Sequence, residues 1–117
     1  MCGIVARFHF SQDPINESLL SKMAKMLRHR GPDATGIWIS KDKKVGLAHT
    51  RLSIIDLSSD ANQPMSNKQN SLHIIFNGEI YNHQEIRKEL INRGVRDWKT
   101  KNSDTEVVLK SFEFWGI

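Results

Sequence analysis

Hydrophobic and polar residues alternate along the first ten positions of the chain. The apolar side chains that fall on one side of an extended backbone are Ile4, Ala6, Phe8 and Phe10. Alternation with a period of two is typical of a β-strand with one buried face. We therefore expect a strand over residues 2–10, with these four side chains on its buried face.

The period changes to that of a helix over residues 13–32. Asp13 can cap this helix and Pro14 suits its first position, because proline lacks the N–H that a first turn leaves unbonded. Gly31 and Pro32 are expected to end it. The predicted buried face consists of Ile15, Leu19, Met23 and Met26 or Leu27.

Short strands with a polar loop are expected in the middle of the chain. Two strands, at 35–40 and 45–50, flank a lysine-rich turn, and the second runs on towards 51–57. A loop rich in Ser, Asp, Asn and Pro covers 58–70, and a further strand is expected at 71–77.

Two capping boxes predict helices in the last third of the chain. Asn82 with Glu85 begins the first, and Ser103 with Glu106 begins the second. The expected ends are Gly94 and Gly116. The expected apolar faces consist of Ile86, Leu90 and Ile91 in the first helix, and of Val108, Leu109, Phe112 and Trp115 in the second. Strands followed by helices in this order predict an α+β fold.

Composition places the 117-residue chain among single soluble domains. Apolar residues make up 38% and charged residues 26%, which is ordinary for a globular protein. No apolar run approaches the roughly 18–20 residues that span a bilayer, and no secretory signal is recognisable. The single cysteine cannot form an internal disulfide, so a reducing, cytoplasmic location is expected. The five histidines and the one cysteine show no zinc-type spacing, so no metal site is expected.

The net charge of +4 is distributed along the chain. The densest basic stretch, residues 40–46, is expected to be a turn between two strands. A solvated surface explains this distribution better than a nucleic-acid-binding surface, which would gather the charges in one tract. Neither nucleic acid nor a membrane is expected as a partner.

The lone cysteine, Cys2, stands directly after the initiator methionine. Removal of Met1 would place a thiol and a free α-amine on the same residue. The amine could take the proton of the thiol and later give a proton to a departing amine, which makes a nucleophile and a base without a histidine. Position alone leaves open whether Cys2 is this nucleophile or an inert side chain.

Five motifs decide between these interpretations. In chain order they are MCGIV, LRHRGPDATGIW, LAHTRLSIIDLSSDANQPM, FNGEIYNHQEIRKEL and NSDTEVVL. Together they resemble the glutamine-hydrolysing domain of the asparagine synthase (glutamine-hydrolysing) family, one of the class II, N-terminal nucleophile amidotransferases. The resemblance extends from residue 2 to about residue 116.

The resemblance implies a fold and a domain organisation. The family's domain is an N-terminal nucleophile (Ntn) hydrolase-type αββα sandwich of roughly 200 residues. We therefore expect residues 1–117 to be the N-terminal part of such a domain, with the ATP-dependent synthetase domain absent. The resemblance implies no cofactor for glutamine hydrolysis, and ATP and Mg²⁺ only for the synthetase domain.

The resemblance also implies the residues of the site. Cys2 would attack the side-chain amide of glutamine, and the amide of Asn77 with the N–H of Gly78 would form the oxyanion hole. Arg51 would bind the α-carboxylate of glutamine and Asp104 its α-ammonium group. The further residues expected to bind glutamine are Leu52, Ser53, Ile54, Ile55 and Glu79, together with Asn77 and Gly78. Arg28, Arg30 and Asp33 are expected to organise the loop around the N-terminus.

Two departures from the family pattern affect these assignments. Ala6 occupies a position where the family usually has glycine. The segment before Ser103 is about one residue longer than usual, which bears on the position of Asp104.

Several alternatives stay open at this point. Taken singly, Arg51 could be a surface residue, Asn77-Gly78 a hairpin turn and Asp104 a helix-favouring acid. The chain could be an inactive fragment or an interaction module, and a second copy of the chain, in a homodimer, is a further candidate partner. Within the enzyme interpretation, the domain or subunit that accepts ammonia could amidate aspartate, a sugar or another acid.

Overall fold

The computed structural model describes residues 1–54 and 56–116 of the chain. They form two compact units, which we describe separately. Unit 1 consists of Met1–Ser53, Asn62–Pro64 and Ile75–Asn77, and unit 2 consists of Ile54–Ala61, Met65–Ile74 and Gly78–Ile117.

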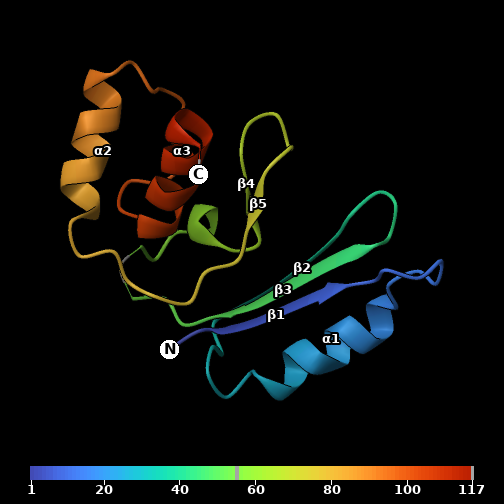
Figure 1. The fold of residues 1–117 in the computed structure, drawn as a ribbon. Coiled ribbons are helices and arrows are strands. Elements are labelled where there is room, and N and C mark those ends of the chain that lie inside the picture. Colours follow the sequence, from blue (N-terminus) through green and yellow to red (C-terminus); the bar gives the residue numbers. More distant parts are fainter. Residues whose placement is uncertain (55, 117) are drawn as a thin grey trace. The chain divides into compact units, whose positions relative to one another are not determined.

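Unit 1 is built on a three-stranded antiparallel sheet (Figure 1). Its strands are β1 (Gly3–Phe8), β2 (Ala34–Ile39) and β3 (Val45–Arg51), in the order β1-β3-β2. The two strands predicted around the lysine-rich turn are therefore confirmed as β2 and β3. The predicted first strand is also present, but it is shorter at both ends than the alternation suggested.

Helix α1 (Glu17–Met26) follows β1 and packs against the sheet. The cap predicted at Asp13 is wrong. The helix begins three residues later, where the side chain of Asn16 accepts a hydrogen bond from the N–H of Leu19 at 3.0 Å. The last helical residue, Met26, also comes before the predicted Gly31-Pro32 stop.

The core of unit 1 lies between α1 and the sheet. It consists of Val5, Ile15, Leu20, Ala24 and Ala48, with Met23, Leu27 and Ile39 packed against it. The predicted helix face was partly wrong, because Leu19 is 43% and Met26 77% exposed. Leu20 and Ala24 are buried in their place. They lie on the side of the helix that packs against Val5 of β1 and Ala48 of β3.

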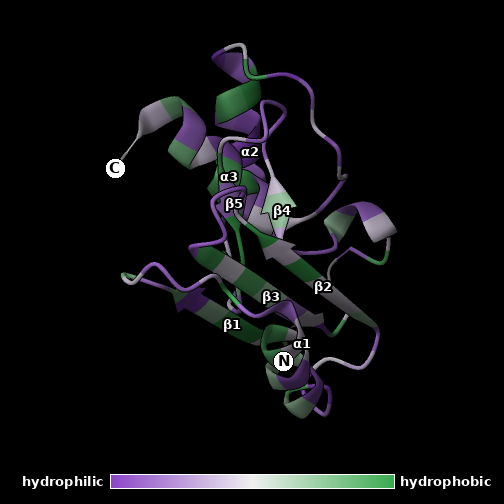
Figure 2. Cartoon of the chain, turned by 90° about the vertical axis from the view of Figure 1, so that its right-hand side faces the viewer, coloured by the Kyte–Doolittle hydropathy of each residue, from purple (hydrophilic) through white to green (hydrophobic). Residues whose placement is uncertain are grey.

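The predicted buried face of β1 is also wrong. Val5 and its cross-strand neighbour Ala48 face α1, so Ile4 and Phe8 point to the opposite side of the sheet. Ile4 is 46% and Phe8 55% exposed. Alternation alone cannot tell which face a helix will cover, since apolar residues occupy both faces of this strand. Figure 2 shows hydrophobic residues recurring along the strands of this sheet.

Unit 2 contains the remaining elements. They are a 3₁₀ turn η1 (Ser59–Ala61), strands β4 (Met65–Ser66) and β5 (His73–Ile74), and helices α2 (His83–Asn92) and α3 (Asp104–Trp115). β4 and β5 pair in an antiparallel ribbon. The loop predicted over 58–70 therefore contains a 3₁₀ turn and a short strand, and the strand predicted over 71–77 is reduced to two residues.

The predicted ends of α2 and α3 are largely correct. Ser103 caps α3 by accepting from the N–H of Glu106 at 3.4 Å, whereas the Asn82 side chain makes no cap bond at the start of α2. Gly94 and Gly116 follow the helices with φ of 97° and 78°. These left-handed conformations explain why glycine stands at the C-terminal end of each of the two helices.

The predicted apolar face of α3 is only partly correct. Leu109 is buried, but the aromatic side chains of Phe112 and Trp115 are 43% and 46% exposed. Val107 is buried where Val108 was expected. No helix in the described ranges is long and apolar enough to cross a membrane. Helices with antiparallel sheets confirm the α+β class.

The cap of α1 gives a direct test of where this helix begins. We expect Asn16→Ala to lower the free energy of unfolding by about 1 kcal/mol, because the N–H of Leu19 loses its acceptor. Asp13→Ala, at the position that the sequence pattern favoured, should change stability by less than about half of that. Urea denaturation of both variants measures the difference. An equal or larger loss for Asp13→Ala would contradict the structure.

Candidate functional site

The sulfur of Cys2 lies against the backbone of a residue fifty positions away. The N–H of Leu52 donates to Sγ at 3.3 Å, and Sγ lies 3.7 Å from the carbonyl oxygen of the same residue. Cys2 is partly buried, and it is a free thiol. A donor and an acceptor on one residue fix the position of the sulfur.

The backbone next to Cys2 is held by the sheet and by one side chain. Gly3 pairs with Thr50 across β1 and β3. A Cβ atom on Gly3 would come within 2.6 Å of the Thr50 hydroxyl and 2.8 Å of Leu27, so only glycine permits this approach. The Nε of Arg30 donates to the carbonyl oxygen of Cys2 at 3.1 Å. The backbone of Cys2 and Gly3 is therefore held by strand β3 and by the side chain of Arg30.

Asp33 holds the segment that follows β3. Its N–H donates to the carbonyl oxygen of Arg51 at 3.0 Å, and its carboxylate accepts from the N–H of Ser53 at 2.7 Å. The chain therefore passes Leu52 in a fixed conformation. These contacts of Arg30 and Asp33 agree with the organising role that the sequence predicted for them, while Arg28 is exposed.

Arg51 ends β3 with a buried side chain, of which 7% is exposed. Its guanidinium donates to Oδ1 of Asn62 at 2.7 Å. Gly31 passes so close to β3 that a Cβ atom there would lie 2.3 Å from the carbonyl oxygen of Thr50. A charged, planar group with a fixed orientation is suited to bind a carboxylate through two parallel hydrogen bonds.

His49 lies in the same strand and is 1% exposed. Its Nε2 lies 3.3 Å from the carbonyl oxygen of Phe76, the residue before Asn77. Burial lowers the pKa of His49 below its ordinary value of 6.5, the contact with Phe76 opposes this, and the nearby positive charge of Arg51 lowers the pKa further. The ring is therefore neutral at pH 7.

Unit 2 carries the other predicted residues. Asp104, with 6% of its surface exposed, accepts from the N–H of Ile80 at 3.1 Å and from that of Thr105 at 2.8 Å. This contact ties Asp104 to the segment directly after Glu79. Gly78, Glu79 and Ile54 are exposed. Ile55 lies outside the described residues.

Glu106 sets the position of Asp104 in a way that the capping box did not predict. Its buried carboxylate accepts from the N–H groups of Lys99 and Thr100, at 2.7 and 2.8 Å, and from the Thr100 hydroxyl at 2.6 Å. The expected return bond to the N–H of Ser103 is replaced by a bond from that N–H to the Thr100 hydroxyl at 3.3 Å. Glu106 therefore fixes the conformation of the segment before Ser103 through its bonds to Lys99 and Thr100.

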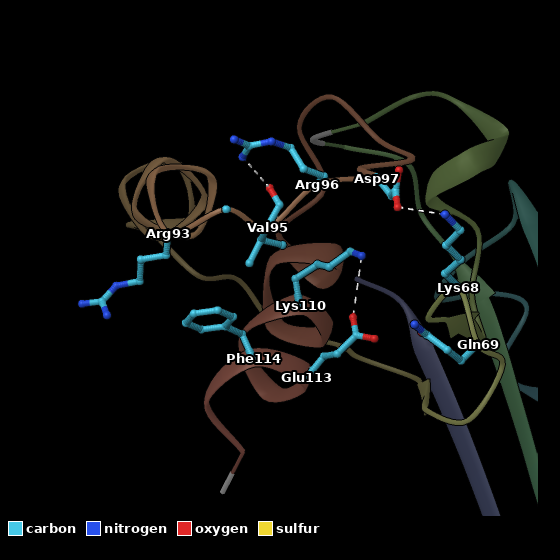
Figure 3. Close-up of a pocket in the computed structure, with 10 residues that line it drawn as sticks. Lys68, Gln69, Arg93, Val95, Arg96, Asp97, Lys110, Glu113 and Phe114 are labelled. Atoms are coloured by element: carbon cyan, nitrogen blue, oxygen red, sulfur yellow. Dashed lines mark hydrogen bonds and ion pairs between the residues drawn. The ribbon is translucent and has the colours of Figure 1, made fainter.

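A pocket of about 290 Å³ opens elsewhere in unit 2 (Figure 3). Lys68 pairs with Asp97 at 2.9 Å, and Lys110 lies 3.6 Å from Glu113. The remaining lining residues are Gln69, Arg93, Gly94, Val95, Arg96 and Phe114. None of them is a predicted site residue. Their cations lie beside carboxylates or backbone oxygens.

The predicted site residues thus fall into two groups. Unit 1 brings Cys2 together with Leu52, and it also contains Arg51, Ser53 and Asn77. Unit 2 contains the others. Sequence reasoning missed the hydrogen bond from Arg51 to Asn62 and the contact of His49 with the carbonyl oxygen of Phe76. The described residues contain no group of three or more His, Cys, Asp or Glu side chains that could hold a metal ion.

Comparisons with known proteins identify the family. The profile of the family described as glutamine amidotransferase domain matches residues 1–117. The chain is 39% identical over its whole length to asparagine synthetase (glutamine-hydrolyzing) 1 of Arabidopsis thaliana. It is 40% identical over 97% of its length to asparagine synthetase B (glutamine-hydrolyzing) of Escherichia coli strain K12. Over 79% of its length it is 41% identical to amidase chry2 of Gibberella zeae.

The chain therefore belongs to the family of glutamine amidotransferase domains. It covers 19% of the Arabidopsis protein, 20% of the Escherichia coli protein and 13% of the Gibberella protein. The chain thus spans about a fifth or less of the length of these relatives.

The lowered pKa of His49 predicts how stability depends on pH. As the pH falls through 6.5, the unfolded chain binds more protons at this histidine than the native chain does, so native stability falls with falling pH. His49→Gln removes the titration. The stability difference between wild type and this variant should be constant above about pH 7 and should change in favour of the variant towards about pH 5.5. Urea denaturation across this range measures the difference. The exposed His29→Gln is the control, and an equal slope for both variants would refute the prediction.

Proposed function

We propose that this member of the glutamine amidotransferase family hydrolyses the side-chain amide of glutamine, with the thiol of Cys2 as nucleophile. The observation that carries the proposal is the position of the sulfur, which the backbone of Leu52, the residue after Arg51, holds. Met1 is 71% exposed and is therefore accessible for removal. Its removal frees the α-amine of Cys2, which then serves as the base.

The first half-reaction forms a thioester. The α-amine takes the thiol proton, and the sulfur attacks the carbonyl carbon of the glutamine side chain. The electron pair of the carbonyl moves to its oxygen, where the Asn77 amide and the Gly78 N–H donate hydrogen bonds. As the C–N bond breaks, the ammonium group of Cys2 gives its proton to the leaving nitrogen, and ammonia departs. Preorganised donors of this kind are worth about 3–4 kcal/mol each in the barrier.

The second half-reaction restores the enzyme. The α-amine takes a proton from water, and the resulting hydroxide attacks the thioester carbon. The C–S bond breaks, the sulfur regains its proton from the ammonium group, and glutamate leaves. Asn77 and Gly78 stabilise the oxyanion again, so both steps use the same donors.

Arg51 gives the site its preference for an amino acid. Its guanidinium can bind the α-carboxylate of glutamine through two parallel hydrogen bonds, while Asn62 keeps the plane of the group oriented. Burial of the side chain strengthens the interaction with an anionic group because less water competes for the donors. The backbone of Leu52, Ser53, Ile54 and Ile55 would line the pocket beside it.

Asp104 is suited to bind the α-ammonium group of glutamine, with the segment around Glu79. An ionised carboxylate offers about four acceptor positions. Two of them are used by the N–H groups of Ile80 and Thr105, one on each oxygen. The carboxylate is thus oriented before substrate arrives, and it retains acceptor capacity for an ammonium group.

The architecture of unit 1 supports the assignment to an Ntn-type αββα sandwich. Helix α1 covers one face of the antiparallel sheet, which corresponds to one α layer on one β layer. The other face carries Ile4 and Phe8, which are half-exposed apolar residues. A second sheet packed on that face would bury them and complete the inner layers of such a sandwich.

The use of the released ammonia is inferred from the relatives. The names of the Arabidopsis and Escherichia coli proteins describe glutamine-hydrolysing asparagine synthetases, and both are far longer than this chain. We therefore propose that a synthetase domain or subunit consumes the ammonia, with aspartate as the first acceptor to test. ATP and Mg²⁺ belong to that reaction, and no step of glutamine hydrolysis proposed above uses them.

The Cys2 thiol is tested by glutamate release from glutamine. The sample is protein whose intact mass shows that Met1 has been removed. We expect Cys2→Ala to lower turnover at least about a thousandfold, since no other group can form the thioester. A form with an uncleaved extension before Cys2 is the matched control, because it keeps the thiol but lacks the free amine. It should be as inactive as Cys2→Ala. Glutamate release that survives in Cys2→Ala would refute the mechanism, and a folded but inactive wild type would favour an interaction module.

The role of Arg51 is tested by the dependence of turnover on glutamine concentration. Arg51→Lys keeps the charge but loses the planar pair of donors, so KM should rise about 10–100-fold with a smaller change in kcat. Asn62→Ala should raise KM less, because it only frees the orientation of the guanidinium. The exposed Arg28→Lys is the control and should leave KM unchanged. An unchanged KM in Arg51→Lys would show that a group other than Arg51 binds the α-carboxylate of glutamine.

A further inference from the structure

We infer that His49 and Gln63 are positioning residues for the oxyanion donor Asn77, which they orient by holding the backbone of Phe76 from both sides. The inference rests on the proposed function, in which the Asn77 amide stabilises the oxyanion. All four residues belong to unit 1.

Two side chains hold Phe76. Gln63 accepts from the N–H of Phe76 through Oε1 at 2.6 Å, and Nε2 of His49 lies 3.3 Å from the Phe76 carbonyl oxygen. The N–H belongs to the peptide group before Phe76, and the carbonyl belongs to the peptide group that joins Phe76 to Asn77. Because peptide groups are planar, fixing both of them fixes the backbone on which Asn77 is built.

Asn77 depends on this backbone support. Within residues 1–54 and 56–116, no hydrogen bond is made by Asn77 or by Gly78, and Asn77 is exposed. The next backbone anchor along the chain is the N–H of Ile80, which is bonded to Asp104. The position of the Asn77 backbone, from which its amide side chain projects, is therefore set chiefly by what holds Phe76.

Both supporting side chains are immobilised by burial. His49 is 1% and Gln63 8% exposed. A buried polar side chain that loses its partner leaves an unsatisfied group, so these contacts are hard to break. For His49, the acceptor on Phe76 selects the tautomer with the proton on Nε2. The lowered pKa keeps the ring in this neutral form at pH 7.

Gly36 makes room for this arrangement. In the register of β2 and β3, Gly36 lies directly opposite His49, so both face the same side of the sheet. A Cβ atom on Gly36 would lie 2.0 Å from the carbonyl oxygen of Gln63. Only glycine at this position lets the backbone of Gln63 lie against β2. From this position the side chain of Gln63 reaches the N–H of Phe76.

The catalytic consequence follows from the geometry that an oxyanion hole requires. Its donors must lie about 2.7–3.1 Å from the position that the oxygen will occupy in the transition state. A loosened Phe76 would spread Asn77 over several orientations, and each turnover would have to select the productive one. The loss should appear in kcat and not in KM, because the ground-state contacts with glutamine are made by other residues.

The experiment compares disrupting and conservative variants at each position. Gln63→Met and His49→Leu remove the acceptor and the donor, and we expect kcat to fall about 10–100-fold with KM for glutamine changed less than about twofold. Gln63→Glu retains an acceptor oxygen and His49→Gln retains a donor at similar reach, so both should recover most of the activity. A loss in KM with unchanged kcat, or unchanged kinetics in both disrupting variants, would overturn the inference.

A double-mutant cycle separates positioning from a general structural role. In an Asn77→Ala background, Gln63→Met and His49→Leu should cause little further loss of kcat, because the group they orient is already gone. A full additional loss in that background would show that they act by another route and would overturn the inference.

A measurement without turnover distinguishes failure of the inference from failure of the proposed function. Amide hydrogen exchange should show the Phe76 N–H protected in wild type and at least tenfold faster exchanging in Gln63→Met, with the amides of β3 unchanged. If wild-type protein hydrolyses no glutamine while this protection is present, the proposed function fails and the hold on Phe76 stands. If the Phe76 N–H is unprotected in wild type, the inference fails whatever the activity.

Discussion

The pairing of β1 with β3 is the constraint on which the candidate site depends. This pairing brings the second residue of the chain beside residue 52, and the register fixes which backbone groups face the sulfur of Cys2. Gly3 is required at the end of β1 because its neighbours leave no room for a side chain. The same strand, β3, supplies His49 and Arg51, which are two residues apart and therefore on the same face of the sheet. One antiparallel ladder thus determines the surroundings of the Cys2 sulfur, the Arg51 guanidinium and the His49 ring.

The sequence predicted the order of elements well and their faces poorly. The strands around the lysine-rich turn and the helix ends at Gly94 and Gly116 follow from local turn and cap chemistry, which short stretches of sequence contain. The buried face of β1 and the start of α1 depend on which neighbour covers an element. Ile4 and Val5 are equally apolar, and only the position of α1 decides that Val5 is buried.

The candidate site residues came from motifs and not from periodicity. The resemblance to the asparagine synthase family implied Cys2, Arg51, Asn77 and Asp104, and the structure gives Cys2, Arg51 and Asp104 fixed partners. The supporting contacts could not be predicted in this way. The bond from the Phe76 N–H to Gln63, and those from Lys99 and Thr100 to Glu106, involve backbone atoms, which carry no signature in the sequence.

The distance of fifty residues between Cys2 and Leu52 also has a consequence during synthesis. Ribosomes add about 5–20 residues per second, so Leu52 is made about 3–10 s after Cys2. Throughout that interval the thiol has no β3 to lie against and is open to oxidants and to enzymes that trim the nascent N-terminus. The contacts that position the sulfur of Cys2 can therefore form only after β3 and Leu52 have been made.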